Sequence, residues 1–518
     1  MLKNLKHLGA AFVACAALWA CSDDKYEPDP IPTPGNTEEY LSVESVTPDQ
    51  VEATGGEVTI TVKSHRVATG KAADEWVKRS TSERNDDVMT FVYTVSANEG
   101  IERTTTITFS CGELTADATI SQKGAIIGPG PTPPVIQEAA NSVEMAKLMS
   151  LGWNLGNQLD SHNNGVASET AWGNAATTQA LFMQLAQSGI KAVRIPVTWL
   201  GKFGSAPDYK IDEAWLNRIA EVVGYAENAG LYAIINMHHD GANSAYWLDI
   251  KGAATDASKQ AAIKEQITAM WGQIAARFAD KGHFLMFEAF NEIHDGGWGW
   301  GDNRKDGGKQ YAALNEWNQT FVDAVRAGGG YNATRFLGIP GYVTNPALTM
   351  DHLVLPNDPA GTDRLLVAVH FYDPTQFAIE ATATEWGHTG NPANTAGWGD
   401  EANVTDTFDK LANKYISAGH GVYVGECGAT TRSTERDEAF RLYYIEYVFK
   451  AAADRGLAMF FWDNGSAATG KEAFGLFNHT TGRFISSKAE AAVATMVKAF
   501  TTDDPAYTLQ SVYDNAPQ

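Results

Sequence analysis

Eight short apolar segments, separated by stretches with helical patterning, constrain the fold of this chain more than any other feature. Each segment is rich in β-branched or aromatic residues, as expected for a strand buried on both faces of a parallel sheet. Between most of them apolar residues recur with helical spacing, as in residues 263–278. The eight segments are residues 151–157, 190–199, 231–240, 283–292, 335–341, 364–373, 421–426 and 457–464. Eight such units within residues 137–505 predict a (β/α)8 TIM barrel.

The ends of these segments carry polar and aromatic side chains. In a TIM barrel the C-terminal ends of the strands meet on one face and form the active site. Packing alone does not explain so many polar groups at strand ends, so we expect a binding site on that face. The candidate residues are Asn157, Arg194, His238, His239, His370, Tyr372 and Trp462.

Two glutamates mark the ends of the fourth and seventh expected strands. The apolar run that begins at Phe284 ends in Asn291 and Glu292, and residues 421–426 end in Glu426. Cleavage of a glycosidic bond uses two carboxyl groups, one that protonates the leaving oxygen and one that attacks the sugar carbon or activates a water. We therefore expect Glu292 and Glu426 to be catalytic, with carboxyl groups roughly 5–5.5 Å apart as in retaining enzymes.

Charge and motif spacing exclude several other classes of function. The formal net charge of −23 argues against nucleic acid or an anionic membrane surface as a partner, and is compatible with a neutral polysaccharide. A metal is the rival interpretation for His238, His239 and His370. Because no HExxH motif or clustered His/Asp spacing accompanies them, we expect neither a metal nor a cofactor.

The first residues have the pattern of an export signal. Lys3 and Lys6 form a basic start, and an apolar run too short to span a membrane follows. The string LWAC resembles a bacterial lipobox with Cys21 as the lipidated residue, and SDDKYE after it resembles the export signal of surface lipoproteins in the Bacteroidetes. We expect residues 1–20 to be the signal and the protein to be an outer-membrane lipoprotein on the cell surface. An ordinary cleaved secretory signal is the alternative.

The region between the signal and the barrel has a different character. Residues 21–40 form a Pro-rich linker, and residues 41–124 contain short alternating segments typical of an all-β immunoglobulin-like sandwich. The pattern resembles the BACON module, which leaves a sugar-binding or a spacer role open, since only Trp76 offers a large flat face. Residues 125–136 form a second linker, and residues 506–518 form a C-terminal tail.

Four cysteines do not make a disulfide framework. Cys15 is expected to leave with the signal, and Cys21 to carry the lipid. Cys111 and Cys427 fall in different predicted domains, so we expect both to be free thiols.

Across residues 150–480 the chain resembles glycoside hydrolase family 5, and more narrowly its subfamily 4 endoglucanases. The matching strings are GWNLGNQLD, VRIPVTW, INMHHDG, FEAFNEIHDGGWGW, VHFYDPTQF, GECG and FWDNG. The resemblance implies that Glu292 is the acid/base and Glu426 the nucleophile. It assigns supporting positions around the cleaved sugar to Arg194, His238 together with His239, Asn291, His370, Tyr372 and Trp462. Cys427 departs from the family pattern, which often has Phe or Trp there.

Elementary electrostatics extends these assignments. Glu426 must be ionised to attack, so we expect Arg194 and the Tyr372 hydroxyl to donate to it. Glu292 must first be protonated, and we expect burial and the charge of Glu426 to raise its pKa. Glu288 lies four residues before Glu292 on the same inward face, so we expect a buried, paired acid.

The sequence thus predicts a monomeric retaining endo-β-1,4-glucanase that cuts xyloglucan, mixed-linkage β-glucan or cellulose-type chains, and that meets the membrane only through its lipid. A family 5 β-mannanase and a non-catalytic glycan-binding protein are the alternatives. Tryptophans in the expected loops would line an open cleft. They are Trp172, Trp247, Trp298, Trp300, Trp386 and Trp398.

Overall fold

The computed structural model describes residues 39–98, 100–125 and 134–518. The expected signal at residues 1–20, the lipidation site Cys21 and most of the two expected linkers lie outside these ranges.

The N-terminal domain consists of two four-stranded β-sheets, as predicted. Alternate residues of its strands, such as Val58, Ile60 and Val62, point inward and are fully buried together with Phe91 and Phe109. All pairs are antiparallel except the short contact of β2 with β8. One sheet has the order β1 (Leu41–Thr47), β3 (Gly56–Ser64), β6 (Val88–Val95), β5 (Val77–Asn85). The other has the order β2 (Gln50–Val51), β8 (Leu114–Gln122), β7 (Arg103–Cys111), β4 (Thr69–Ala72).

The C-terminal domain is the predicted barrel of eight parallel strands, closed by pairing of the last strand with the first. Its strands are short and almost entirely buried, which explains why they read as continuous apolar runs. In chain order they are β9 (Leu151–Leu155), β12 (Ala192–Ile195), β13 (Tyr232–Ile235), β14 (Leu285–Glu288), β15 (Leu337–Pro340), β16 (Leu365–Phe371), β17 (Gly421–Cys427) and β18 (Ala458–Asp463).

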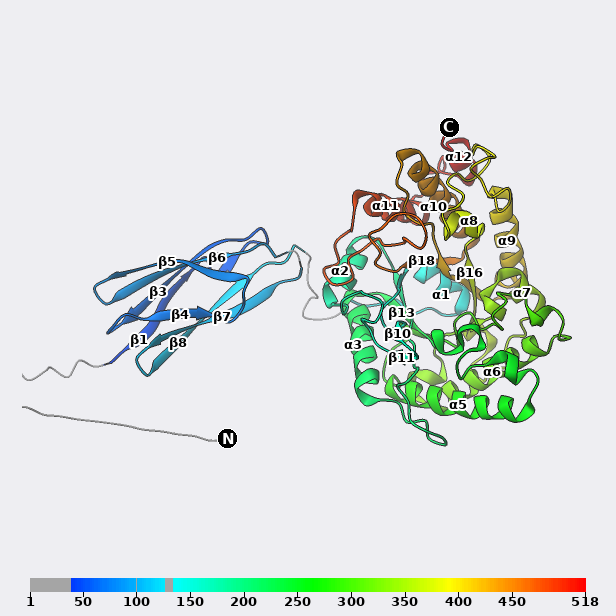
Figure 1. Cartoon of the computed structure of the whole chain (residues 1–518), viewed down its shortest axis with the longest axis horizontal. Coiled ribbons are helices and arrows are strands. Elements are labelled where there is room, and N and C mark those ends of the chain that lie inside the picture. Colours follow the sequence, from blue (N-terminus) through cyan, green and yellow to red (C-terminus); the bar gives the residue numbers. More distant parts are fainter. Residues whose placement is uncertain (1–38, 99, 126–133) are drawn as a thin grey trace, which may run out of the picture.

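Helices surround the barrel strands (Figure 1). The larger helices are α1 (Ser142–Met149), α2 (Gln179–Gln187), α3 (Glu213–Ala229), α5 (Ala257–Arg277), α6 (Lys309–Ala327), α9 (Glu401–Lys414), α10 (Glu435–Arg455) and α11 (Ser487–Thr501). Helix α5 buries the expected stripe that includes Ile267 and Trp271, and Asp256 caps its start by accepting from two backbone N–H groups. Among the described residues, no helix is both long enough and apolar enough to cross a membrane.

Short elements fill the connections on the barrel. They are the hairpin β10 (His162–Asn163) and β11 (Val166–Ala167), the short α-helices α4 (Ile250–Ala253), α7 (Pro346–His352), α8 (Thr375–Ala378) and α12 (Leu509–Asp514), and the 3₁₀ turns η1 (His239–Ser244), η2 (Asp302–Arg304), η3 (Gly330–Ala333), η4 (Tyr342–Thr344), η5 (Thr362–Arg364) and η6 (Ile416–Ala418). Helix α12 belongs to the stretch predicted as a tail. It packs on the barrel domain, since Val512 is buried and the Tyr513 ring stacks 3.7 Å from that of His388.

The fourth strand is shorter than predicted. Strand β14 ends at Glu288, whereas the apolar run continues to Glu292. The backbone still runs along the neighbouring strands, because the N–H of Ala289 donates to Gly338 and that of Asn291 donates to Met237. Glu292 therefore stands beyond the sheet, at the mouth of the barrel.

A buried arginine, Arg335, connects the C-terminal end of helix α5 with the start of strand β15. Arg335 is fully buried and donates to the side chain of Asn332 and to four backbone carbonyls. The four carbonyls belong to Phe278, Lys281, Gly282 and Leu285. Its guanidinium also lies 4.6 Å from the centre of the Phe287 ring.

We predict that Arg335→Met lowers the free energy of unfolding by about 3–5 kcal/mol, because buried carbonyls lose their donors. Equilibrium urea unfolding measures the change. The exposed Arg277→Met at the end of α5 is the matched control and should leave the midpoint within error. A midpoint for Arg335→Met equal to that of the control would contradict this account.

Candidate functional site

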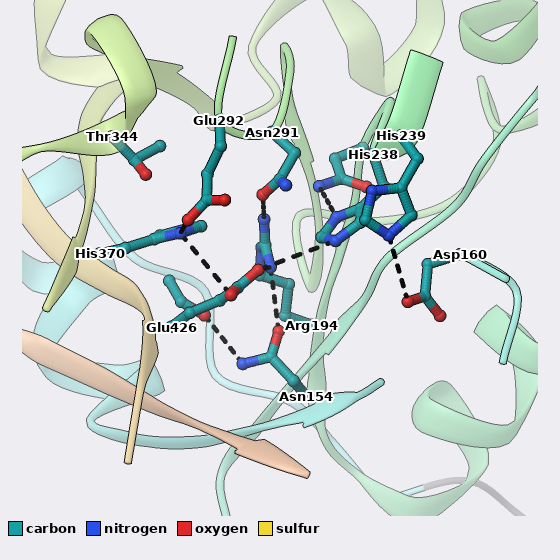
Figure 2. A network of polar contacts seen from close by, with 12 residues as sticks. Asn154, Asp160, Arg194, His238, His239, Asn291, Glu292, Thr344, His370 and Glu426 are labelled. Carbon is teal, nitrogen blue, oxygen red and sulfur yellow. Dashed lines mark hydrogen bonds and ion pairs between the residues drawn. The ribbon is translucent and has the colours of Figure 1, made fainter. Parts of the chain in front are cut away.

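The site is organised around one arginine inside the barrel (Figure 2). Arg194 of β12 is fully buried and donates through Nε and Nη2 to both oxygens of Glu288, at 3.0 and 2.7 Å. Its Nη1 donates to Glu426 at 2.7 Å and to the amide oxygen of Asn154 at 3.1 Å. Nη2 also donates to the amide oxygen of Asn291 at 2.9 Å. Burial opposes the charge of Arg194, but the two glutamates raise its pKa and keep it protonated.

Glu288 is the buried, paired acid that the sequence predicted. It is fully buried and accepts from Tyr423 at 2.7 Å and from Asn236 at 2.9 Å in addition to Arg194. Burial raises the pKa of Glu288, but Arg194 outweighs this and holds the pKa below its ordinary value. Glu288 is therefore an ionised partner that fixes Arg194.

Glu426 lies near the end of β17, as predicted, and receives the two expected donors. Besides Arg194, the Tyr372 hydroxyl donates to its second oxygen at 3.3 Å. His370 Nδ1 lies 3.7 Å and His238 Nε2 lies 3.9 Å from its carboxylate. Burial is the largest influence on Glu426 and, together with the charge of Glu292, raises its pKa above the ordinary value, although His370 and Arg194 oppose that rise.

Glu292 faces Glu426 across His370. The Nδ1 atom of His370 lies 2.7 Å from Glu292 Oε1. One carboxylate oxygen of Glu292, one of Glu426 and a ring nitrogen of His370 all lie within 4.8 Å of one another. This closeness of the two carboxyl groups favours the narrow spacing of a retaining enzyme over the wider spacing of an inverting one.

The expectation of a raised pKa for Glu292 is wrong for this arrangement. Burial does raise it, but the contact with His370, followed by the charge interactions with His370 and His294, lowers the pKa below its ordinary value. The sequence could not show this, because the separation of His370 from Glu292 depends on how β16 and the segment after β14 are packed.

The remaining predicted residues form a second side of the site. The ring of His238 stacks on that of Trp462, with 5.8 Å between centroids and 5° between planes. Burial, and then the neighbouring His239, lower the pKa of His238 well below its ordinary value, so this imidazole is neutral. The half-buried Asn157 follows β9 in a left-handed turn with φ of 58°, and its N–H donates to Asp160.

Sequence reasoning missed three partners of the central network, Asn154, Asn236 and Tyr423. All three are buried polar residues on barrel strands or just beyond them. Their polarity within otherwise apolar strands is the signal that could have found them.

Two groups of described residues have ligand atoms close enough to hold a cation. One is Asp160, His238 and His239, and the other is Glu292, His370 and Glu426. In the second group an ion would compete with Arg194 and Tyr372 for Glu426 and with His370 for Glu292.

The tryptophans expected in the cleft have different environments. Four are substantially exposed: Trp172, Trp298, Trp300 and Trp398. Trp247 is half-buried and donates to Asp240 at 2.7 Å. The expectation is wrong for Trp386, which is only 2% exposed and packs against Tyr443, Tyr444 and Tyr447. A loop sequence gives no periodicity from which burial could be predicted.

The two cysteines within the described residues are free, as predicted, and both are buried. Cys427 Sγ lies 3.4 Å from the carbonyl oxygen of Phe460, and burial raises its pKa. Cys111 lies in the core of the β-sandwich.

Comparison with known protein families gives two matches. The model of Cellulase (glycosyl hydrolase family 5) matches residues 159–468, and the model of the BACON domain, described as a putative N-terminal binding domain, matches residues 66–123.

Among curated proteins, Endoglucanase A of Paenibacillus barcinonensis is 38% identical over 353 residues, which are 65% of this chain and 85% of that protein. Among solved structures, a GH5-4 broad specificity endoglucanase from Bacteroides salanitronis is 58% identical with a TM-score of 0.69, covering 72% of this chain and 99% of that one. A Bacteroides ovatus GH5 xyloglucanase in complex with a XXXG heptasaccharide is 30% identical with a TM-score of 0.63, covering 89% of this chain and 100% of that one.

Residues 159–468, which the family 5 model matches, lie within the barrel domain. Because that model spans more than half of the chain, and because each of these relatives is matched over most of its length, this chain belongs to glycosyl hydrolase family 5, a retaining family, and carries an N-terminal BACON domain.

Proposed function

We propose that Glu426 and Glu292 carry out a double displacement on β-1,4-glucan chains, with Glu426 as nucleophile and Glu292 as acid/base. The observation that supports this assignment most is the asymmetry of their partners. Glu426 accepts from the permanently charged Arg194, whereas Glu292 contacts only the titratable His370 among these groups. A nucleophile needs a fixed cation, and an acid/base needs a partner that tolerates both protonation states.

In the first step a carboxylate oxygen of Glu426 forms a bond to the anomeric carbon. The bond between that carbon and the glycosidic oxygen breaks, and its electron pair goes to the oxygen, which takes the proton of Glu292. His370 Nδ1 can accept the O–H of protonated Glu292 when the imidazole is neutral, or donate to its carboxylate. The contact therefore survives the proton transfer.

In the second step Glu292 acts as a base. A water gives its proton to Glu292 and bonds to the anomeric carbon, and the Glu426 ester is released as a carboxylate. The negative charge then returns to Glu426, where Arg194 and Tyr372 donate to it.

Asn291, Trp462 and His238 hold the sugar. Arg194 donates to the amide oxygen of Asn291, which leaves the amide NH2 group of Asn291 as a donor for a sugar 2-hydroxyl. Trp462 is half-buried, and its stacking on the neutral His238 fixes the plane on which a sugar ring can lie.

We predict that Glu426→Gln lowers kcat at least ~10⁴-fold on a β-1,4-glucan while polymer binding persists, because the amide cannot attack. Glu292→Gln should lower kcat less on substrates with a good leaving group than on the polymer, since a good leaving group departs with little protonation. Steady-state kinetics and affinity electrophoresis measure the two effects. The exposed Glu472→Gln, in the loop after β18, is the control and should behave as wild type. Wild-type turnover by Glu426→Gln would rule out the assignment.

For the substrate, we propose internal cleavage of β-1,4-glucans with xyloglucan or mixed-linkage β-glucan as the natural polymer. Relatives with broad-specificity endoglucanase and xyloglucanase names support this class. The exposed tryptophans on loops of the barrel suit an extended chain rather than a single sugar.

We predict that the viscosity of a glucan solution falls well before most reducing ends appear. A panel of xyloglucan, mixed-linkage β-glucan, carboxymethylcellulose, mannan and xylan, assayed for reducing-sugar release, ranks the substrates. Glucose as the first product, or mannan cut faster than every glucan, would contradict this proposal.

For location, we propose a monomer anchored by lipid at Cys21 and displayed outward from the outer membrane, with the BACON domain as a spacer. The Arg103 guanidinium lies 4.1 Å from the ring centre of Trp76. It also donates to Gln122 and to two backbone carbonyls. Trp76 is also half-buried and packs against the core of the sandwich. Little of its ring is therefore left for a sugar, which favours the spacer role.

We predict that Cys21→Ala moves the protein from the membrane fraction to the soluble fraction, because the lipidated thiol is lost. Fractionation with antibody detection measures this. Size-exclusion chromatography of the released form tests whether the protein is monomeric. Added protease should degrade the wild-type protein on intact cells. Resistance to protease would count against outward display.

A further inference from the structure

A short loop beyond Glu292 presents two exposed tryptophans. Trp298 is 57% exposed and Trp300 is 79% exposed, although six other tryptophans among the described residues are buried. A large aromatic side chain left in water forgoes the free energy that burial would give it. Such exposure on an ordered loop points to a ligand.

The backbone of this loop is held by its own side chains. The Asp295 carboxylate accepts from the N–H groups of Gly297 and Asn303, at 2.9 and 3.0 Å. Asn303 and Arg304 both donate to the carbonyl of Gly299, at 3.0 and 2.7 Å. The two aromatic side chains therefore project from a fixed turn.

Each tryptophan also has one face occupied. The Trp298 ring lies 4.3 Å from the ring of buried His294, and the Arg304 guanidinium lies 4.5 Å from the centre of the Trp300 ring. Trp298 adopts a left-handed backbone conformation, with φ of 50°, which is unfavourable for a bulky residue. His294 and Arg304 thus lie against one face of each indole ring, and the opposite face of each ring is left for a ligand.

This loop lies on the Glu292 side of the site. His294 is two residues beyond Glu292 and lies close enough to help lower the pKa of Glu292. Trp298 in turn contacts His294, so the loop continues outward from the acid/base.

A different aromatic surface lies on the other side. His239 contacts His238, and Trp172 packs 5.3 Å from His239 and 5.5 Å from His162. Figure 2 shows Glu292 and the pair His238–His239 on opposite sides of Glu426. The acid protonates the oxygen that departs, so sugars beyond Glu292 belong to the leaving group.

We propose that Trp298 and Trp300 form a platform that binds the leaving-group sugars, so that they determine affinity and cleavage position on the acceptor side. This inference rests on the proposed roles of Glu292 and Glu426. The ligand class is a β-linked glucose chain, whose flat C–H faces stack on indole rings.

The test compares two substrates of different reach. Cellohexaose fills both sides of the site, whereas β-cellotriosyl fluoride has a leaving group of one atom and fills only the retained side. For Trp298→Ala and Trp300→Ala, the ratio of kcat/KM on cellohexaose to kcat/KM on the fluoride should fall roughly 10-fold from the wild-type ratio. Phe at either position should recover most of that ratio.

Trp172→Ala is the matched control on the opposite side. It removes a comparably exposed indole and should lower both kcat/KM values together. With reducing-end-labelled cellohexaose, Trp298→Ala and Trp300→Ala should move the first cut toward the reducing end, because fewer sugars are then held on the leaving-group side. Trp172→Ala should not move the cut in that direction. Circular dichroism and thermal unfolding check that each variant is folded.

Ratios within two-fold of wild type for both Trp298→Ala and Trp300→Ala would overturn the proposal. Equal losses on both substrates would also overturn it, since the loop would then act on the reacting groups or the fold. Failure of the wild-type protein on both substrates would instead overturn the proposed function, so the two failures are distinguishable.

Discussion

The ion pair between Arg194 and Glu288 is the interaction on which the rest of the site depends. Both side chains are fully buried, and a buried pair is stable only when its remaining donors and acceptors are satisfied. Glu288 meets this condition with Tyr423 and Asn236, which leaves Arg194 with donors for Asn154, Asn291 and Glu426. One guanidinium thus connects four elements of the barrel and directs its positive charge at Glu426.

The barrel provides the space and the rigidity that this network needs. Gly338 on β15 has no side chain, and a Cβ there would collide with the hydroxyl of Tyr423. Glu288 and Arg194 are on strands, whereas Glu292 stands beyond the sheet and contacts His370. The fixed charges are therefore in the core, and the group proposed to exchange protons is at the mouth.

Much of this arrangement was predictable from the sequence, because it follows from strand patterning. Apolar runs gave the eight strands, and the alternation of side chains along a strand placed Glu288 on the inward face with Glu292. The contacts of Arg194 and Tyr372 with Glu426 followed from the chemistry of a carboxylate that must stay ionised. Asn154, Asn236 and Tyr423 were not predicted as partners, since their meeting depends on the stagger between strands. The lowered pKa of Glu292 and the burial of Trp386 depend on loop packing, which has no periodic signal.

The most direct test of the account is to trap the covalent intermediate. A 2-deoxy-2-fluoro-β-cellotriosyl fluoride should inactivate the enzyme with a stoichiometry of one, because the fluorine at C2 slows both steps while the fluoride leaving group at C1 speeds only formation of the ester. After proteolysis, mass spectrometry should locate the added trisaccharide on Glu426, and Arg194→Met should slow the labelling. A label on Glu292 or Glu288, or hydrolysis of the substrate with no covalent label and with inverted configuration, would contradict the central role of Glu426.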